Sequence, residues 1–129
     1  MKNILIVDDN KLNLMAAKMT LDPLYKVTAV SMGAQALQYL ESNSCDLVLL
    51  DIDMPDMDGF EVLEKMKEMN LQQQPPVIFL TANTDPETIT RCMDEGGVEI
   101  IDKPFVKKVL LTRIANLLEL TDYRAGVHE

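Results

Sequence analysis

Short apolar runs recur along the chain, and each is followed by residues with a different, helical spacing. The runs lie at residues 3–7, 25–30, 47–50, 76–80 and 98–101, and they are rich in Val, Ile, Leu and other β-forming residues. Continuous runs of this kind, without alternating polar positions, are typical of strands that are buried on both faces of a sheet. The pattern therefore predicts five strands.

Helical spacing and capping signals follow the strands and predict five helices. In the first helix, apolar residues repeat at Leu12, Met15, Ala16 and Met19. Asp58 with Glu61 three residues later is typical of a capping box, and Asp85-Pro86 of an N-cap followed by proline. The predicted helices run from about residue 11 to Asp22-Pro23, over 33–43, from Asp58, over 85–96, and around residues 110–118.

Strands that alternate with helices predict an α/β fold, in which a parallel sheet is covered by helices on both faces and joined by right-handed crossovers. The 129 residues fit one domain. We assign that domain to residues 1–120, and the polar residues 121–129 to a tail or to the start of a linker toward a missing output domain. No apolar run approaches the ~20 residues of a membrane span. We expect a soluble, cytoplasmic protein with no membrane partner.

The charge balance narrows the choice of partners. Lys and Arg number 12 against 21 Asp and Glu, which gives a formal net charge of −9. A field of this sign repels phosphate backbones and argues against direct nucleic-acid binding by this domain. Cys45 and Cys92 lie far apart without metal-ligand spacing, so we expect reduced, partly buried thiols.

Polar residues of complementary chemistry end four of the five predicted strands: Asp8-Asp9, Asp51, Thr81 and Lys103. Ligands of open parallel sheets bind outside the carboxyl ends of the strands, so these residues should converge there. Crowded carboxylates raise one another's pKa unless a cation intervenes, and Mg²⁺ suits such oxygen ligands. A lysine and a hydroxyl nearby can contact phosphoryl oxygens. The set predicts phosphoryl transfer to an aspartate.

Each of these residues also has a structural interpretation when taken alone. Asp8-Asp9 fits a capping pair for the first helix, because acidic residues favour helix N-termini. Asp51 fits a turn, Thr81 a hydroxyl at a strand end, and Lys103 a solvated charge before a proline. Four independent coincidences are needed for the structural interpretation, whereas one shared site explains all four motifs, so we favour the site.

The motifs Asp8-Asp9, Leu50 to Gly59, Leu80-Thr81-Ala82 and Lys103-Pro104-Phe105 resemble those of two-component response-regulator receiver domains, of the chemotaxis-regulator kind. The resemblance covers roughly residues 3–120, nearly the whole chain. It implies a flavodoxin-like, doubly wound (βα)5 fold with five parallel strands in the order 2-1-3-4-5.

The resemblance also implies roles for single residues. Asp51 is similar to the phosphoacceptor, which also contacts the metal. Asp9 is similar to a direct Mg²⁺ ligand and Asp8 to one that acts mostly through water, while the backbone carbonyl of Asp53 supplies a further ligand. Thr81 and Lys103 are similar to the hydroxyl and the ammonium that contact the phosphoryl group.

Three further positions bear on the switch by resemblance. Asp53 and Asn83 occupy positions that modulate the lifetime of the phosphoryl group. Ile100 stands where receivers commonly carry an aromatic that swings inward on activation. A shift of Thr81 and of the loop that follows it is then left as the movement that couples phosphorylation to the output surface. The Lys103-Pro104 bond is similar to one that is cis in the family.

The resemblance therefore implies phosphorelay signalling rather than an enzyme of many turnovers, with chemistry limited to self-phosphotransfer and autodephosphorylation. A histidine kinase, a phosphotransfer protein or a small phosphodonor would phosphorylate Asp51. The phosphoryl group would switch the surface of the fourth helix, fifth strand and fifth helix toward an effector protein, an output domain or a phosphorylation-dependent dimer. Similar chain endings recur in receivers fused to cyclic-di-GMP enzymes or kinases.

Rival functions on related folds fit the sequence less well. A flavodoxin-like electron carrier needs a phosphate-cradling loop after the first strand, where this chain has Asp8-Asp9, and aromatics around the flavin, which make up only 5% of residues. An aspartate-nucleophile phosphatase usually carries its nucleophile-x-Asp motif on the first strand, whereas Asp51-Ile52-Asp53 follows the third. A degenerate interaction module would not need the intact site.

Overall fold

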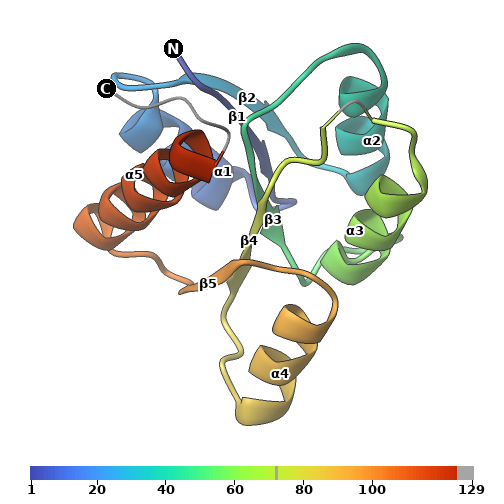
Figure 1. The fold of residues 1–129 in the computed structure, drawn as a ribbon. Helices are drawn as coiled ribbons and strands as arrows, with labels where there is room; N and C mark the ends of the chain where they lie inside the picture. The colour runs from blue at the N-terminus through green and yellow to red at the C-terminus, as the bar shows by residue number, and fades with distance from the viewer. Residues whose placement is uncertain (72, 125–129) are drawn as a thin grey trace.

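The structure is a computed structural model that describes residues 1–71 and 73–124 (Figure 1). Five strands alternate with five helices, as the sequence predicts. Their bounds are β1 Asn3–Val7, α1 Lys11–Leu21, β2 Lys26–Val30, α2 Gly33–Ser42, β3 Leu47–Asp51, α3 Gly59–Glu68, β4 Val77–Thr81, α4 Pro86–Asp94, β5 Glu99–Asp102 and α5 Lys107–Arg124. All strand pairs are parallel, in the order β2-β1-β3-β4-β5. The predicted flavodoxin-like topology is confirmed.

The sheet separates two hydrophobic cores because alternate side chains of each strand point to opposite faces. On one face, residues such as Leu5, Val48 and Phe79 pack with the buried sides of α2 and α3. On the other, residues such as Ile4 and Ile78 pack with α1 and α5. Figure 1 shows these two helix pairs on either side of the sheet, with α4 beside β5. Burial on both faces explains the continuous apolar runs of the strands.

Local capping chemistry fixes where three helices begin. Asp58 and Glu61 form the predicted capping box of α3, with the Asp58 carboxylate accepting from the Glu61 N–H at 2.9 Å. Asp85 accepts from the Thr88 N–H at 2.7 Å, and Pro86 follows it as the first residue of α4. Helix α1 is capped by Asn10, whose side chain accepts from the Asn13 N–H.

The apolar repeat that predicts α1 does not face the core. Leu12 is 80% exposed and Met19 70%, and Met15 is exposed as well. The helix packs instead through Ala17 and Leu21, which are fully buried. A small residue such as Ala17 lets the helix backbone approach the sheet closely, whereas long methionine side chains are tolerated on the outer face.

The C-terminal helix extends past the predicted domain boundary. Helix α5 continues to Arg124, four residues beyond the expected end at residue 120. The rest of the predicted tail, residues 125–129, lies outside the described residues. Within the part of the chain that the structure describes, no helix is long and apolar enough to cross a membrane.

Candidate functional site

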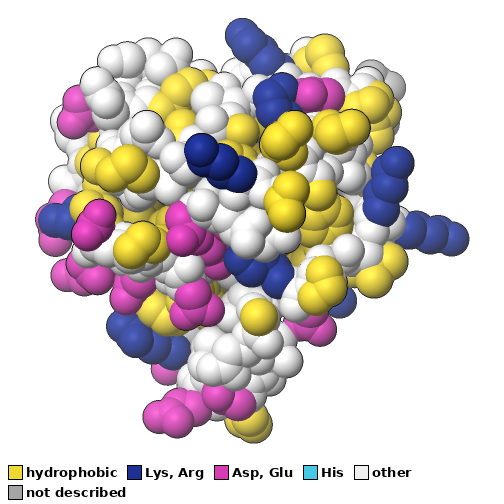
Figure 2. Space-filling view, turned by 180° about the vertical axis from the view of Figure 1, so that it is seen from behind, with side chains coloured by type: hydrophobic (Ala, Val, Ile, Leu, Met, Phe, Trp, Pro, Cys, Tyr) yellow, Lys and Arg dark blue, Asp and Glu magenta, His cyan; other side chains and the backbone are white. Residues whose placement is uncertain are grey.

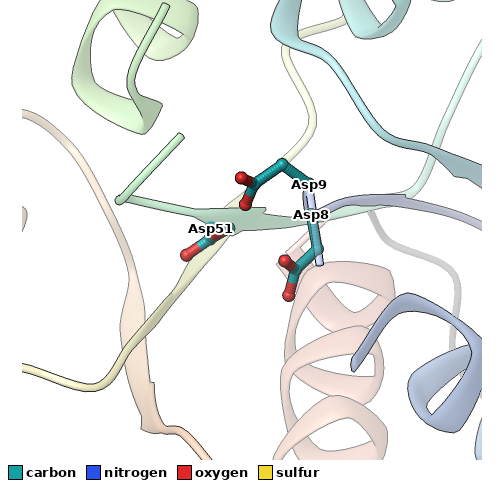
Figure 3. Close-up of side chains that lie close together, drawn as sticks. All are labelled: Asp8, Asp9 and Asp51. Atoms are coloured by element: carbon teal, nitrogen blue, oxygen red, sulfur yellow. The ribbon is translucent and has the colours of Figure 1, made fainter. Parts of the chain in front are cut away.

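Three carboxylates meet at the carboxyl edge of the sheet (Figure 3). Asp8 and Asp9 follow β1, and Asp51 is the last residue of the neighbouring strand β3. One oxygen from each of the three lies within 4.8 Å of the others. Asp8 and Asp51 are buried, whereas Asp9 is exposed. The cluster is therefore open to solvent on the side of Asp9.

Lys103 contacts two of these carboxylates from the end of the sheet beyond β5. Its Nζ lies 2.9 Å from Asp51 Oδ1 and 3.3 Å from Asp8 Oδ2. The backbone N–H of Lys103 donates to the Thr81 carbonyl at 2.9 Å, which attaches the lysine to the end of β4. The Lys103-Pro104 peptide bond is cis. Side chains from the ends of β1, β3 and β5 thus meet at one site, and a backbone hydrogen bond attaches the end of β4 to it.

The two oxygens of Asp51 have different surroundings. Oδ1 accepts from Lys103 Nζ and, at 3.3 Å, from the Asp53 N–H. Oδ2 is buried and has no hydrogen-bond partner among the described residues. A buried, unpaired carboxylate oxygen is costly unless a ligand completes it. This atom therefore offers a position that a ligand such as a cation can occupy.

Burial dominates the electrostatics of Asp51. Desolvation raises the pKa of this carboxyl to about 7, the hydrogen bond from Lys103 opposes the rise, and the neighbouring charge of Asp8 adds to it. Burial alone would lower the pKa of Lys103, but its hydrogen bond and charge interactions with Asp51 and Asp8 outweigh that effect and raise it. Lys103 consequently stays protonated, while Asp51 is an uncommonly basic carboxylate.

The donor set fits a hard divalent cation. Carboxylate oxygens are the ligands that Mg²⁺ prefers, and Mg²⁺ keeps several waters when it binds few side chains. Asp8, Asp9 and Asp51 supply such oxygens, one of them from an exposed residue that leaves room for water. The orphaned Oδ2 of Asp51 is consistent with a ligand that completes its coordination.

Backbone contacts hold the acidic residues in place. The Asn10 N–H donates to Asp8 Oδ1 at 2.9 Å, and the Gly59 N–H donates to the Ile52 carbonyl at 2.9 Å. A Cβ on Gly59 would lie 2.5 Å from the Asp51 carbonyl oxygen, so only glycine allows α3 to begin this close to β3. The interpretation of Asp8-Asp9 as the caps of α1 is wrong, because Asn10 caps that helix.

Thr81 ends β4 with its side chain buried and already engaged. Its hydroxyl accepts from the Asn83 N–H at 2.9 Å and donates to the Asn83 carbonyl at 3.1 Å. Asn83 itself is exposed, and its side chain accepts from the Asp85 N–H at 3.2 Å. The hydroxyl therefore holds the β4–α4 loop, residues 82–85, in this state.

Ile100 lies on β5 with its side chain half-buried against the core cluster of α2 and α3. It lines a shallow groove between α4 and β5, together with Ile89 and Met93. Asp53 is exposed and lines a cleft beside the acidic cluster, between α3 and α4. Phe60 and Arg91 also line this cleft. Neither residue carries a signal in the sequence, because they lie on different helices and belong to no motif.

A doubly wound sheet with this acidic edge belongs to the flavodoxin-like class of folds. A family model, the response regulator receiver domain, matches residues 4–115. The chain therefore belongs to the response regulator receiver family of two-component signalling.

Several known proteins are similar over most of the chain. A probable cyclic di-GMP phosphodiesterase of Vibrio cholerae is 37% identical over 116 residues, which cover 90% of this chain and 26% of that protein. The response regulator SaeR of Staphylococcus epidermidis is 36% identical over 120 residues, covering 92% of this chain and 51% of SaeR. The chain thus spans about half or less of the length of these curated relatives.

Solved structures agree with this assignment. A CheY-like receiver domain protein from Methanospirillum hungatei superposes with a TM-score of 0.87 at 30% identity, covering 96% of this chain and 98% of that one. The chemotaxis protein CheY4 of Vibrio cholerae gives a TM-score of 0.84 at 28% identity, covering 90% and 98% of the two chains.

Proposed function

We propose that the chain accepts a phosphoryl group on Asp51 in a Mg²⁺-dependent reaction. The observation that carries the proposal is the pair of environments at Asp51: one oxygen bound to Lys103, the other buried and unpaired beside Asp8 and Asp9. Asp8, Asp9, Asp51 and the backbone carbonyl of Asp53 would hold the ion. When bound, it neutralises charge on the transferring group and on the crowded carboxylates.

The phosphodonor in this proposal is a phosphohistidine of a histidine kinase or phosphotransfer protein, or a small acyl phosphate. A carboxylate oxygen of Asp51 attacks phosphorus, the bond from phosphorus to the donor breaks, and the donor leaves with its electron pair. Lys103 supports the reaction because its ammonium already lies against the acceptor and can follow the negative charge onto the phosphoryl oxygens. The chain would thereby act as a phosphoacceptor switch and not as an enzyme of many turnovers.

The signal is proposed to leave through α4, β5 and α5. A phosphoryl group on Asp51 offers Thr81 a new hydrogen-bond acceptor, and Thr81 holds the loop that leads into α4. Asn83 lies in this loop and Asp53 lies two residues past Asp51. Both line the cleft between α3 and α4, where they would tune the lifetime of the phosphoryl group. The controlled partner is an effector protein or a fused output domain. The output domain is supported by the fact that this chain matches only a part of longer relatives.

Intact mass spectrometry after incubation with acetyl phosphate and Mg²⁺ tests the proposal. The wild-type chain should gain one phosphoryl group that hydroxylamine removes, because an acyl phosphate reacts with that reagent. Asp51→Asn should gain none, whereas Asp56→Asn, a matched change in the exposed loop that follows, should label like wild type. Full labelling of Asp51→Asn would contradict the assignment of the acceptor. Continuous release of phosphate over many cycles would favour a phosphatase instead.

A further inference from the structure

Helix α4 is weakly embedded in the molecule. Of its residues only Cys92 is buried, and its apolar side chains Ile89 and Met93 are exposed. Figure 1 shows the helix at the lower end of the molecule, beside β5 and apart from α1 and α5. The few side chains that join α4 to its neighbours therefore decide where it lies.

Arg91 joins α4 to α3. Its guanidinium carbon lies 4.0 Å from the centroid of the Phe60 ring, an arrangement in which the cation is attracted to the aromatic face. Phe60 is 6% exposed, and its ring packs against that of Phe79 in β4 with centroids 5.3 Å apart. At the same C-terminal end of α4, Lys67 of α3 donates to the backbone carbonyl of the capping residue Glu95.

The aromatic partner of Arg91 is fixed relative to the acceptor. Phe60 directly follows Gly59, whose N–H donates to the carbonyl of Ile52, the residue after Asp51. The beginning of α4 is attached to the same site by the other route, through the Thr81 hydroxyl, the β4–α4 loop and the Asp85 cap. A displacement of that loop therefore moves α4 relative to Phe60, and this movement is opposed by the contact between Arg91 and Phe60.

We propose that Arg91 is a positioning residue that holds α4 in its unphosphorylated position and so opposes the switch. This inference rests on the proposed function. For the Thr81 hydroxyl to reach a phosphoryl group on Asp51, it must leave Asn83, and the loop that begins α4 must move. Helix α4 then shifts Arg91 across the Phe60 ring. This contact joins α4 to the beginning of α3 beside Asp51, and the activated state has to loosen it.

The contact has a measurable consequence through linkage. A contact that stabilises only the resting state lowers the affinity for any ligand that favours the activated state. Beryllofluoride with Mg²⁺ mimics a phosphoryl group on a carboxylate and serves as that ligand. Arg91→Ala should bind it about fivefold more tightly than wild type, which corresponds to about 1 kcal/mol. Without ligand, the amides of α4 should exchange hydrogen faster in this variant, while those of α2 stay unchanged.

Three further variants separate this contact from other effects of the substitution. Glu95→Gln removes the carboxylate that lies 4.0 Å from Arg91 Nε, and it should leave both measurements at the wild-type value. Arg91→Lys keeps the cation and should restore part of the wild-type behaviour. In a Phe60→Leu background the aromatic face is lost, so adding Arg91→Ala should have little further effect.

The outcomes that overturn the inference are distinct from those that overturn the proposed function. Unchanged α4 exchange in Arg91→Ala shows that Arg91 does not hold the helix. Unchanged or weaker binding of beryllofluoride by Arg91→Ala shows that the contact does not oppose the switch. A wild-type chain that binds no beryllofluoride contradicts the proposed acceptor site, and the exchange of α4 in ligand-free variants then decides on Arg91 alone.

Discussion

At the scale of single residues, Asp51 is a carboxylate that the fold makes difficult to ionise. It is fully buried, its pKa is raised to about 7 by desolvation, and a single lysine offsets part of that cost. The site is therefore electrostatically incomplete without a cation, because Asp8 and Asp51 share the one ammonium of Lys103.

Replacing Asp9 by Ala should weaken Mg²⁺ binding by at least about tenfold, a typical scale for one charge-assisted contact. Asp9 brings the exposed carboxylate of the cluster, and its loss leaves Asp8 and Asp51 with less charge for the ion. Isothermal titration with Mg²⁺ measures the effect. Glu64→Ala on α3 removes one exposed charge away from the site and should bind Mg²⁺ as wild type does. Equal affinities in all three proteins would contradict the metal site.

In EDTA, Asp51→Asn should be more stable than wild type at pH 8 by more than about 1 kcal/mol. Because the folded-state pKa of Asp51 is raised above its unfolded value, its contribution to stability is fully present below about pH 4 and is lost as pH rises through 7. The difference between the proteins should therefore shrink as pH falls from 8 to 5. Urea unfolding at several pH values measures it, and a difference that widens toward pH 5 would contradict this reasoning.

At the scale of secondary-structure elements, the proposed chemistry belongs to the carboxyl ends of β1, β3 and β5, and the proposed response belongs to the loop that follows β4. Thr81 links the two because its hydroxyl bonds both backbone groups of Asn83. The proposed acceptor Asp51 does not depend on that hydroxyl, since Lys103 and the acidic residues surround Asp51 without it.

Thr81→Ala should therefore leave phosphorylation intact and reduce the response of α4 and β5. One hydrogen bond contributes about 1 kcal/mol, whereas a nearly complete population shift needs several, so the response should shrink rather than vanish. Amide chemical shifts of residues 86–94 and 99–102, with and without beryllofluoride and Mg²⁺, measure it. Thr81→Ser keeps the hydroxyl and should respond like wild type. Shifts in Thr81→Ala as large as those of wild type would remove Thr81 from the switch.

Gly59→Ala should destabilise the fold by about 1–3 kcal/mol, the usual cost of overpacking, and slow phosphorylation. The new Cβ would meet the Asp51 carbonyl oxygen at 2.5 Å and the Ile52 Cα at 2.9 Å, so the backbone of the acceptor has to move. Gly33→Ala is a matched control at the first residue of α2, because its Cβ meets chiefly side chains of Val62 and Met57. Chemical denaturation of both variants compares them, and an equal or larger loss in Gly33→Ala would contradict the argument.

The sequence predicts the elements better than their contacts. Runs such as 47–50 specify buried strands because both faces of a parallel sheet are covered, and the strand ends then bring Asp51 and Lys103 together. The buried face of α1 is not predicted in the same way. Met15 and Met19 are compatible with either side of a helix, and the side that packs against the sheet is the one that carries Ala17. The contact of Arg91 with Phe60 leaves no signal in the sequence, since it joins two helices whose contacting residues lie far apart along the chain.

At the scale of the whole molecule, charge and exposed apolar surface are unevenly distributed. Figure 2 shows acidic side chains gathered over the left and lower parts of one face, while hydrophobic side chains form patches on its right half. The net charge of −9 draws cations such as Mg²⁺ toward the protein and repels polyanions. The expectation that this domain does not bind nucleic acid directly stays a prediction.

The parallel register of the strands also determines where the chain can change in length. Asp51 lies opposite Leu80, and Thr81 opposite Asp102, so the site is assembled by alignment along the whole sheet. One residue inserted within Val77–Thr81 would turn its side chains to the opposite face and remove Thr81 from the site. The same insertion between residues 69 and 76, at the opposite edge of the sheet, would leave that alignment untouched. Insertions and deletions among natural variants of this chain should therefore accumulate at the amino ends of the strands.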